Sequence, residues 1–171
     1  MKKLSVLFTV ICLILCGCSF KTPHEKVAEA IAIPINITFE VNSGVWNAVI
    51  TADGYTAVLL DGDTAELTLK SGANGTTAEA GGFTREVDGA MFPAVQRFIK
   101  AVRAANNAEA LTAESEGLCE YAIDEMQIMV YYDSDSGLIT NIGTEDRLWR
   151  FDYRVITVGE YEGTGDGEGR S

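Results

Sequence analysis

The strongest constraint on the fold lies between Pro34 and Leu69, where the sequence predicts a run of short strands joined by tight turns. In the first strand, apolar side chains at every second position alternate with polar ones: Ile35, Ile37, Phe39 and Val41. This period of two is typical of a strand with one buried and one solvated face. The chain therefore requires a sheet whose apolar face another element covers.

Short turns divide the rest of this segment into further strands. The turns are Ser43-Gly44, Ala52-Asp53-Gly54 and Asp61-Gly62-Asp63, and the strands between them are Val45–Thr51, Tyr55–Leu60 and Thr64–Leu69. Asp-Gly between apolar runs is a strong indicator of a hairpin, and hairpins join antiparallel neighbours. We expect a loop at Ser71–Gly75, and then one or two weaker strands within Thr76–Val87, interrupted at Gly81-Gly82.

The period then changes to that of a helix between Phe92 and Ala105. The apolar side chains of this segment fall at helical spacing: Phe92, Val95, Phe98, Ile99 and Val102. Pro93 suits the start of a helix, and Asn106-Asn107 suits its end. Three basic residues occupy the opposite face: Arg97, Lys100 and Arg103. We interpret them as a solvated face, with a contact to an acidic headgroup or partner as the alternative.

Strand patterns return after this helix. The predicted strands are Leu118–Ile123, Met126–Tyr132, Leu138–Ile142 and a last one whose inner face carries Trp149, Phe151, Tyr153 and Val155. From Gly159 onward glycine alternates with acidic residues, and such a segment cannot bury enough apolar surface to fold. Near the other end of the chain, Thr22-Pro23-His24-Glu25 has the form of a capping box and predicts a short helix from Pro23 to about Ile31.

The first residues predict export and attachment to a membrane. Lys2 and Lys3 precede an apolar run, Leu4–Leu15, which is too short to span a bilayer. The sequence Leu15-Cys16-Gly17-Cys18 resembles the lipobox of bacterial lipoproteins. The resemblance implies cleavage before Cys18, a diacylglyceryl group on its sulfur, and a place on the extracytoplasmic face of the cell membrane. The alternative is an ordinary secretory signal peptide.

The charge of the chain excludes two classes of partner. The formal net charge is −12, from 13 basic and 25 acidic residues. Removal of residues 1–17 takes away two lysines and no acid, so the net charge of the mature chain becomes −14. Such a chain is not expected to bind nucleic acid or to dock on anionic lipid through a basic patch. Of the four cysteines, only Cys119 stays free after export and acylation, so we expect no intramolecular disulfide.

The order of the expected elements predicts an α+β fold with about eight or nine strands, one main amphipathic helix and a short N-terminal helix. Together with the lipobox, this order over Pro23–Val158 resembles the half-barrel lipoproteins of the LolA and LppX group. The resemblance implies a curled antiparallel sheet, an open half-barrel whose concave face lies under helices and binds acyl chains. The competing fold is an ordinary sheet packed solidly against its helix.

The predicted organisation has four parts: a lipoprotein signal peptide (1–17), a lipidated tether (18–22), a single β-rich domain (23–158) and a disordered, acidic, glycine-rich tail (159–171). Six large side chains of the domain are candidates to line an apolar cleft. They are Phe39, Trp46, Phe98, Trp149, Phe151 and Tyr153. The alternative is that these side chains fill the core between sheet and helix.

No residue set predicts catalysis or a metal site, and we expect no cofactor. His24, the one histidine, is interpreted as a solvated residue at the start of the first helix. Cys119 has no histidine partner in the folded part of the chain, so it predicts a small buried side chain and not a nucleophile. The Asp133–Gly137 segment resembles part of a calcium loop, but a threonine stands where the bidentate glutamate is needed, and a turn is predicted.

These observations favour a membrane-anchored binding lipoprotein with an apolar cleft over an enzyme. Its expected partners are the membrane, through the lipid on Cys18, and a lipid or other apolar ligand. The alternative from another class is a solid structural or protein-interaction module displayed at the cell surface, with a protein partner of unspecified kind and no small-molecule ligand.

Overall fold

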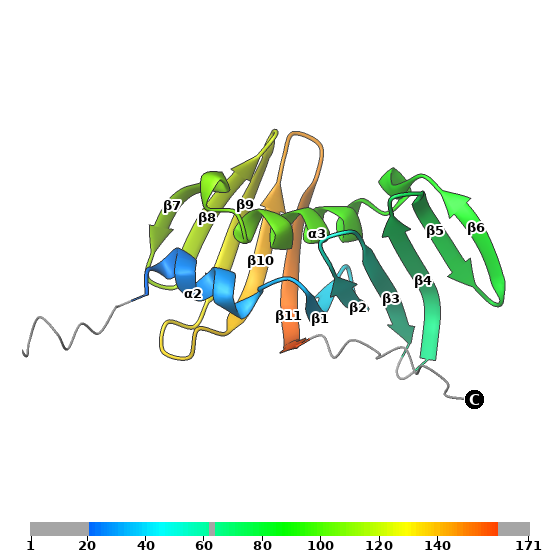
Figure 1. The fold of residues 1–171 in the computed structure, drawn as a ribbon, viewed down its shortest axis with the longest axis horizontal. Helices are drawn as coiled ribbons and strands as arrows, with labels where there is room; N and C mark the ends of the chain where they lie inside the picture. The colour runs from blue at the N-terminus through cyan, green and yellow to red at the C-terminus, as the bar shows by residue number, and fades with distance from the viewer. Residues whose placement is uncertain (1–20, 62–63, 161–171) are drawn as a thin grey trace, which may run out of the picture.

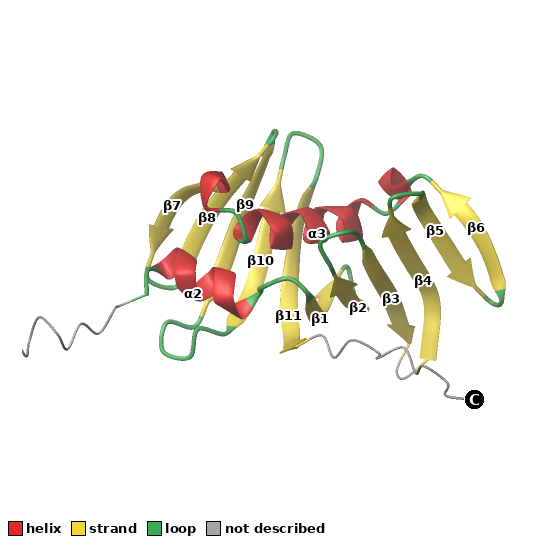
Figure 2. Cartoon of the chain, viewed as in Figure 1, coloured by secondary structure: helices red, strands yellow, loops and turns green. Residues whose placement is uncertain are grey.

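The computed structural model describes residues 21–61 and 64–160, and this part of the chain forms one antiparallel sheet with two α-helices on it (Figures 1 and 2). The 11-stranded sheet has the order β6-β5-β4-β3-β2-β1-β11-β10-β9-β8-β7. It consists of two meanders that meet at its centre, where β1 pairs with β11.

The first meander comprises β1 (Ile35–Val41), β2 (Gly44–Ile50), β3 (Tyr55–Asp61), β4 (Thr64–Gly72), β5 (Gly75–Ala80) and β6 (Phe83–Val87). The second comprises β7 (Leu111–Ser115), β8 (Leu118–Ile123), β9 (Met126–Tyr132), β10 (Ile139–Glu145) and β11 (Arg150–Glu160). The helices are α2 (Pro23–Ala30) and α3 (Pro93–Ala105), with the short 3₁₀ helices η1 (Gly89–Met91) and η2 (Ala108–Ala110) on either side of α3.

Helix α3 links the two outer strands of the sheet, β6 and β7, and therefore runs across one face of it (Figure 1). Its 13 residues extend over about 20 Å. Helix α2 lies on the same face beside β7 and β8, at the C-terminal end of α3 (Figure 1). The side-chain amide of Asn106 joins the two helices by donating to the Ile31 carbonyl at 2.8 Å.

The core lies between this face and the helices, as the alternation in the first strand predicts. Every second residue of β1 is buried, and α3 buries Val95, Phe98, Ile99 and Val102 of its predicted apolar stripe. The predicted capping box of α2 is also confirmed, because Thr22 and Glu25 bond reciprocally across its first turn. The buried residues therefore form one continuous core that fixes both helices on the sheet.

Two parts of the predicted fold class are wrong. The sheet has eleven strands and not eight or nine, chiefly because β7 carries no apolar alternation: four of its five residues are exposed. The expected open half-barrel is also wrong, since the sheet is neither closed nor strongly curled. Curling of the outer strands would need apolar surface there, and residues 83–86 of β6 are all exposed. The predicted loop at Ser71–Gly75 is shorter than expected, because Ser71 and Gly72 belong to β4 and Gly75 to β5.

The predictions for the chain ends fall largely outside the described residues. These include the signal peptide, the lipidated Cys18 and the part of the tail beyond Glu160. Strand β11 continues to Glu160, two residues past the predicted end of the domain at Val158. In the described ranges, no helix is long and apolar enough to cross a membrane.

Candidate ligand-binding hollows

The six candidate lining residues divide into two groups of three. Phe39, Phe98 and Tyr153 are fully buried between the sheet and α3. The rings of Phe39 and Phe98 stack at a centroid distance of 3.6 Å, and the Tyr153 hydroxyl donates to the Ala94 carbonyl at 2.7 Å. These three side chains fill the space under the middle of α3. They therefore follow the second of the two predictions, that the side chains fill the core between sheet and helix instead of lining a cleft.

The other three, Trp46, Trp149 and Phe151, line a hollow of about 370 Å³ at the N-terminal end of α3, which we call the apolar hollow. Trp46 and Phe151 are also buried in the core, whereas Trp149 is exposed. The walls of the hollow come from the end of the sheet near the β1–β2 turn, from the connection between β10 and β11, and from the segment that leads into α3. The apolar side chains that complete it are Val41, Leu59, Met91, Phe92 and Pro93.

Two large apolar side chains that line the apolar hollow are exposed: Met91 is 67% exposed and Trp149 is 48% exposed. Leu148, the neighbour of Trp149 in the chain, is 83% exposed but does not line the hollow. The Trp149 ring stacks on Phe151 at a centroid distance of 5.9 Å, so its inner side is apolar and its outer side faces water. A cluster of exposed apolar side chains beside a hollow is typical of a binding surface.

Asp146 holds Trp149 in this position. One of its carboxylate oxygens accepts hydrogen bonds from the backbone N–H groups of Leu148, at 2.8 Å, and Trp149, at 2.9 Å. The other oxygen forms an ion pair with Arg97 on α3, and both side chains are largely buried. The two backbone N–H groups, and then Arg97, lower the pKa of the Asp146 carboxyl below its usual value. The turn that carries Trp149 is therefore fixed to α3 through a charged group.

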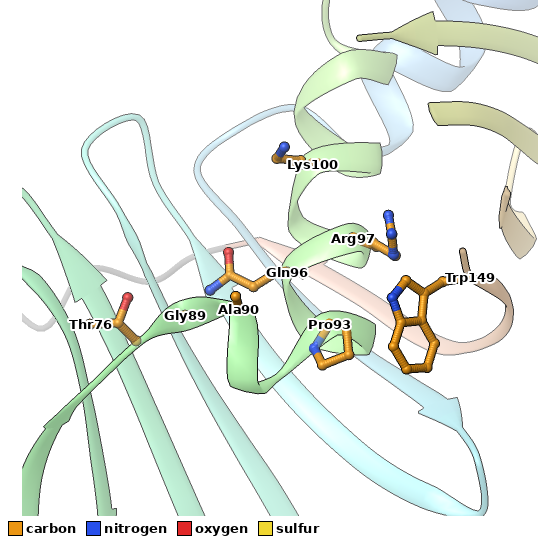
Figure 3. A pocket seen from close by; sticks show the side chains of 8 residues that line it. All are labelled: Thr76, Gly89, Ala90, Pro93, Gln96, Arg97, Lys100 and Trp149. Atoms are coloured by element: carbon orange, nitrogen blue, oxygen red, sulfur yellow. The ribbon is translucent and has the colours of Figure 1, made fainter. Parts of the chain in front are cut away.

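A second hollow, of about 410 Å³, adjoins the first on the outer side of α3. We call it the basic hollow, because Arg97 and Lys100 contribute to its walls together with Gln96 and Thr76 (Figure 3). Pro93 and Trp149 line both hollows. The Gln96 side chain is held by a hydrogen bond from its amide nitrogen to the Tyr55 hydroxyl. The two hollows thus meet at the start of α3.

The predicted basic face of α3 is exposed at Lys100 and Arg103, whereas Arg97 is half-buried. Arg103 donates to the backbone carbonyls of Thr51, at 3.2 Å, and Gly54, at 3.1 Å. Arg97 is paired with Asp146 as described above. The Lys100 side chain is 57% exposed, and its Nζ lies 3.8 Å from a carboxylate oxygen of Asp124.

The residues considered for catalysis do not form a nucleophilic site. Cys119 is fully buried, as predicted, and burial raises the pKa of its thiol, which disfavours the reactive thiolate. His24 lies at the start of α2, as predicted, but it is only partly exposed, and its Nδ1 lies 3.1 Å from the Tyr121 hydroxyl. Within residues 21–61 and 64–160, no group of three or more His, Cys, Asp or Glu side chains is placed to hold a metal ion.

The sequence prediction missed several walls of the apolar hollow. Leu59 was assigned only to a strand, Phe92 only to the buried stripe of α3, and Met91 to no element. A usable signal was present in two places: Met91-Phe92 stands just before a helix, and Leu148-Trp149 stands in a turn between strands. Large apolar residues in such connections are seldom needed for the core.

Comparison with known proteins adds no family assignment. No model of a known protein family matches the chain, and a search of curated proteins finds no match either.

Proposed function

We propose that this protein is a membrane-anchored, extracytoplasmic lipoprotein that binds an apolar ligand, and that it is not an enzyme. The observation that carries the proposal is the apolar hollow, with Met91 and Trp149 exposed at its mouth. Its volume of about 370 Å³ lies in the range of small-molecule sites. Exposure of these side chains to water is unfavourable in the free protein, so an apolar ligand that covers them gains binding energy.

The proposed ligand does not lie between the sheet and the middle of α3. Phe39, Phe98 and Tyr153 occupy that space, and displacing such closely packed rings would cost several kcal/mol. The ligand instead enters beside the first turn of α3, where η1 and the β10–β11 connection leave apolar side chains uncovered. A closed half-barrel is not needed for this mode of binding.

The anchor sets how far the apolar hollow is from the membrane. The predicted tether, Cys18 to Thr22, has five residues and reaches at most about 18 Å. Helix α2 follows it directly and contacts the C-terminal end of α3, whereas the apolar hollow lies at the opposite end of α3, about 20 Å away. In this arrangement the hollow lies at the end of α3 away from the anchored end, and we propose that it receives ligand that has already left the bilayer.

The two tryptophans of the chain allow a direct test, because Trp46 and Trp149 both line the apolar hollow. A bromine-bearing acyl chain quenches tryptophan only on close approach, so titration with it should reduce the emission of the full chain in a saturable way. The unbrominated chain should compete. As a control, Phe83→Ala, which changes an exposed side chain on β6, should bind like wild type. Emission that stays constant at every ligand concentration contradicts the proposal.

The alternative is a protein-interaction module, and one observation favours it. Strand β6 is the outer strand of the sheet, pairs only with β5 among the described strands, and carries Phe83, which is 83% exposed. An open strand edge can accept a strand of another protein. A chain that shows no quenching, and whose binding to a purified protein partner is lost in Phe83→Asp, would support this alternative.

A further inference from the structure

We propose that the ligand is an anionic amphiphile, with its acyl chain in the apolar hollow and its carboxylate or phosphate head in the basic hollow. The inference rests on the proposed function and adds the chemical class of the ligand. The two hollows share Pro93 and Trp149 as walls and therefore lie side by side at the start of α3, and Figure 3 shows these two side chains at the basic hollow. We place the two parts of one ligand in these adjacent hollows.

The basic hollow carries one loosely paired positive charge, Lys100, in a chain that is acidic as a whole. The chain has a net charge of −12, yet none of the described residues that line this hollow is acidic, and two of them, Arg97 and Lys100, are basic. An anion is repelled by most of the surface of such a protein. Binding one therefore requires a positive charge beside the recess. Lys100 supplies it, because the charge of Arg97 is already balanced by Asp146.

Lys100 is the charged group of the basic hollow that can meet an anion. Arg97 is already engaged, because it forms an ion pair with Asp146 and its Nε is buried. Lys100 is more available. Its Nζ lies 3.8 Å from a carboxylate oxygen of Asp124, and because the Asp124 side chain is 78% exposed, this ion pair is weak. Thr76 and Gln96 also line the hollow, but each already donates a hydrogen bond, Thr76 to Ser71 and Gln96 to Tyr55.

An apolar side chain next to these groups selects for an amphiphile over a free anion. Trp149 presents one wall to each hollow, so a ligand without an acyl chain would leave the apolar hollow and its exposed mouth uncovered. A ligand without a charged head would leave Lys100 solvated as before and gain nothing in the basic hollow. Both parts are needed for the full affinity.

The test compares four ligands with the same dodecyl chain: dodecanoate, dodecyl phosphate, dodecanol and dodecyltrimethylammonium. Binding to the full chain is followed by tryptophan emission at concentrations below micelle formation. Both anions should bind about tenfold more tightly than the alcohol, and the preference should decrease in about 1 M NaCl. The ratio of the dissociation constants of dodecanoate and dodecyl phosphate shows whether the hollow prefers a carboxylate or a phosphate head. Attraction to the net charge alone would instead favour the cation.

A matched pair of lysines locates the effect. Lys100→Gln should weaken binding of the anions about two- to fivefold and leave dodecanol unchanged. Lys70→Gln is the control, since Lys70 is 58% exposed, is also paired with one acidic side chain, and lies on β4 outside both hollows. Equal binding of anions and dodecanol, or an equal loss in the two variants, overturns this inference and leaves the proposed function intact. Absence of binding by all four ligands overturns both.

Discussion

Substitution of Phe98 by alanine tests whether α3 is packed rigidly on the sheet. Phe98 is fully buried at the centre of α3 and stacks on Phe39, and the centroid of its ring lies 5.1 Å from that of Tyr153. If α3 were instead a loose cover over an existing cavity, the ring would have few close neighbours to lose. The two descriptions therefore predict different losses of stability.

The expected loss can be estimated from three contributions. Removal of the Phe98 side chain from water on folding contributes about 1.5–3 kcal/mol to the free energy of unfolding. The stacked arrangement with Phe39 adds about 0.5–1.5 kcal/mol, and the cavity left by the missing ring adds more, since the neighbours relax only in part. A total of about 3–5 kcal/mol is typical for Phe→Ala in a close-packed core.

Urea denaturation measures this loss. With a slope of about 2 kcal/mol per M, the midpoint of Phe98→Ala should lie about 1.5–2.5 M below that of wild type. The control Phe83→Ala removes an 83% exposed ring and should shift stability by no more than about 0.5 kcal/mol. A Phe98→Ala midpoint within about 0.5 M of wild type would refute the close-packed core, and would reopen the space under α3 as a ligand site.

Two further predictions concern charge and anchoring. Because the pKa of the Asp146 carboxyl is lowered, its stabilising contribution is present above the unfolded pKa of about 3.9 and is lost as the pH falls through the folded value. Urea midpoints of wild type should therefore drop more steeply below about pH 4 than those of Asp146→Asn, and parallel curves would contradict this. Cys18→Ser should abolish incorporation of labelled palmitate and release the protein from membranes, whereas Cys12→Ser and Cys16→Ser should keep the label; equal labelling of Cys18→Ser would exclude the anchor.

Local periodicity was enough to predict the central part of the fold. The alternation that starts at Ile35 and the helical spacing around Phe98 each place apolar side chains on one side, and hydrophobic burial then decides which face is covered. Both elements occur where they were expected. The capping box at Thr22 was equally readable, because its two hydrogen bonds involve residues only three positions apart.

Elements that depend on distant contacts were not predictable in the same way. Strand β7 has exposed residues on both faces and is held by its backbone pairing with β8, so its sequence carries no period of two. The extent of curling also depends on all strands at once. Thr84, Arg85 and Glu86 of β6 do not supply the apolar surface that would draw this outer strand inward.

The candidate site was predictable in composition but not in position. Trp149 was expected on the inner face of the last strand together with Phe151 and Tyr153, because the three residues alternate. The strand begins only at Arg150, since Asp146 closes a turn on the backbone of Leu148 and Trp149. The apolar alternation therefore includes Trp149, which stands one residue before the start of β11. It is 48% exposed, and its side chain belongs to the surface.

The place of the two hollows follows from the topology of the chain. Helix α3 has to connect the outer strands of an eleven-stranded sheet, so it crosses the sheet with its middle over the central strands, where Phe39 and Tyr153 fill the space beneath it. At its N-terminal end the chain arrives through η1, and Met91 and Phe92 belong to a turn that cannot pack as closely as a helix face. Apolar surface consequently stays uncovered there, next to the basic residues of the first two turns of α3. A connection that was needed to complete the sheet thus leaves, at one end, a recess with an apolar and a basic part side by side.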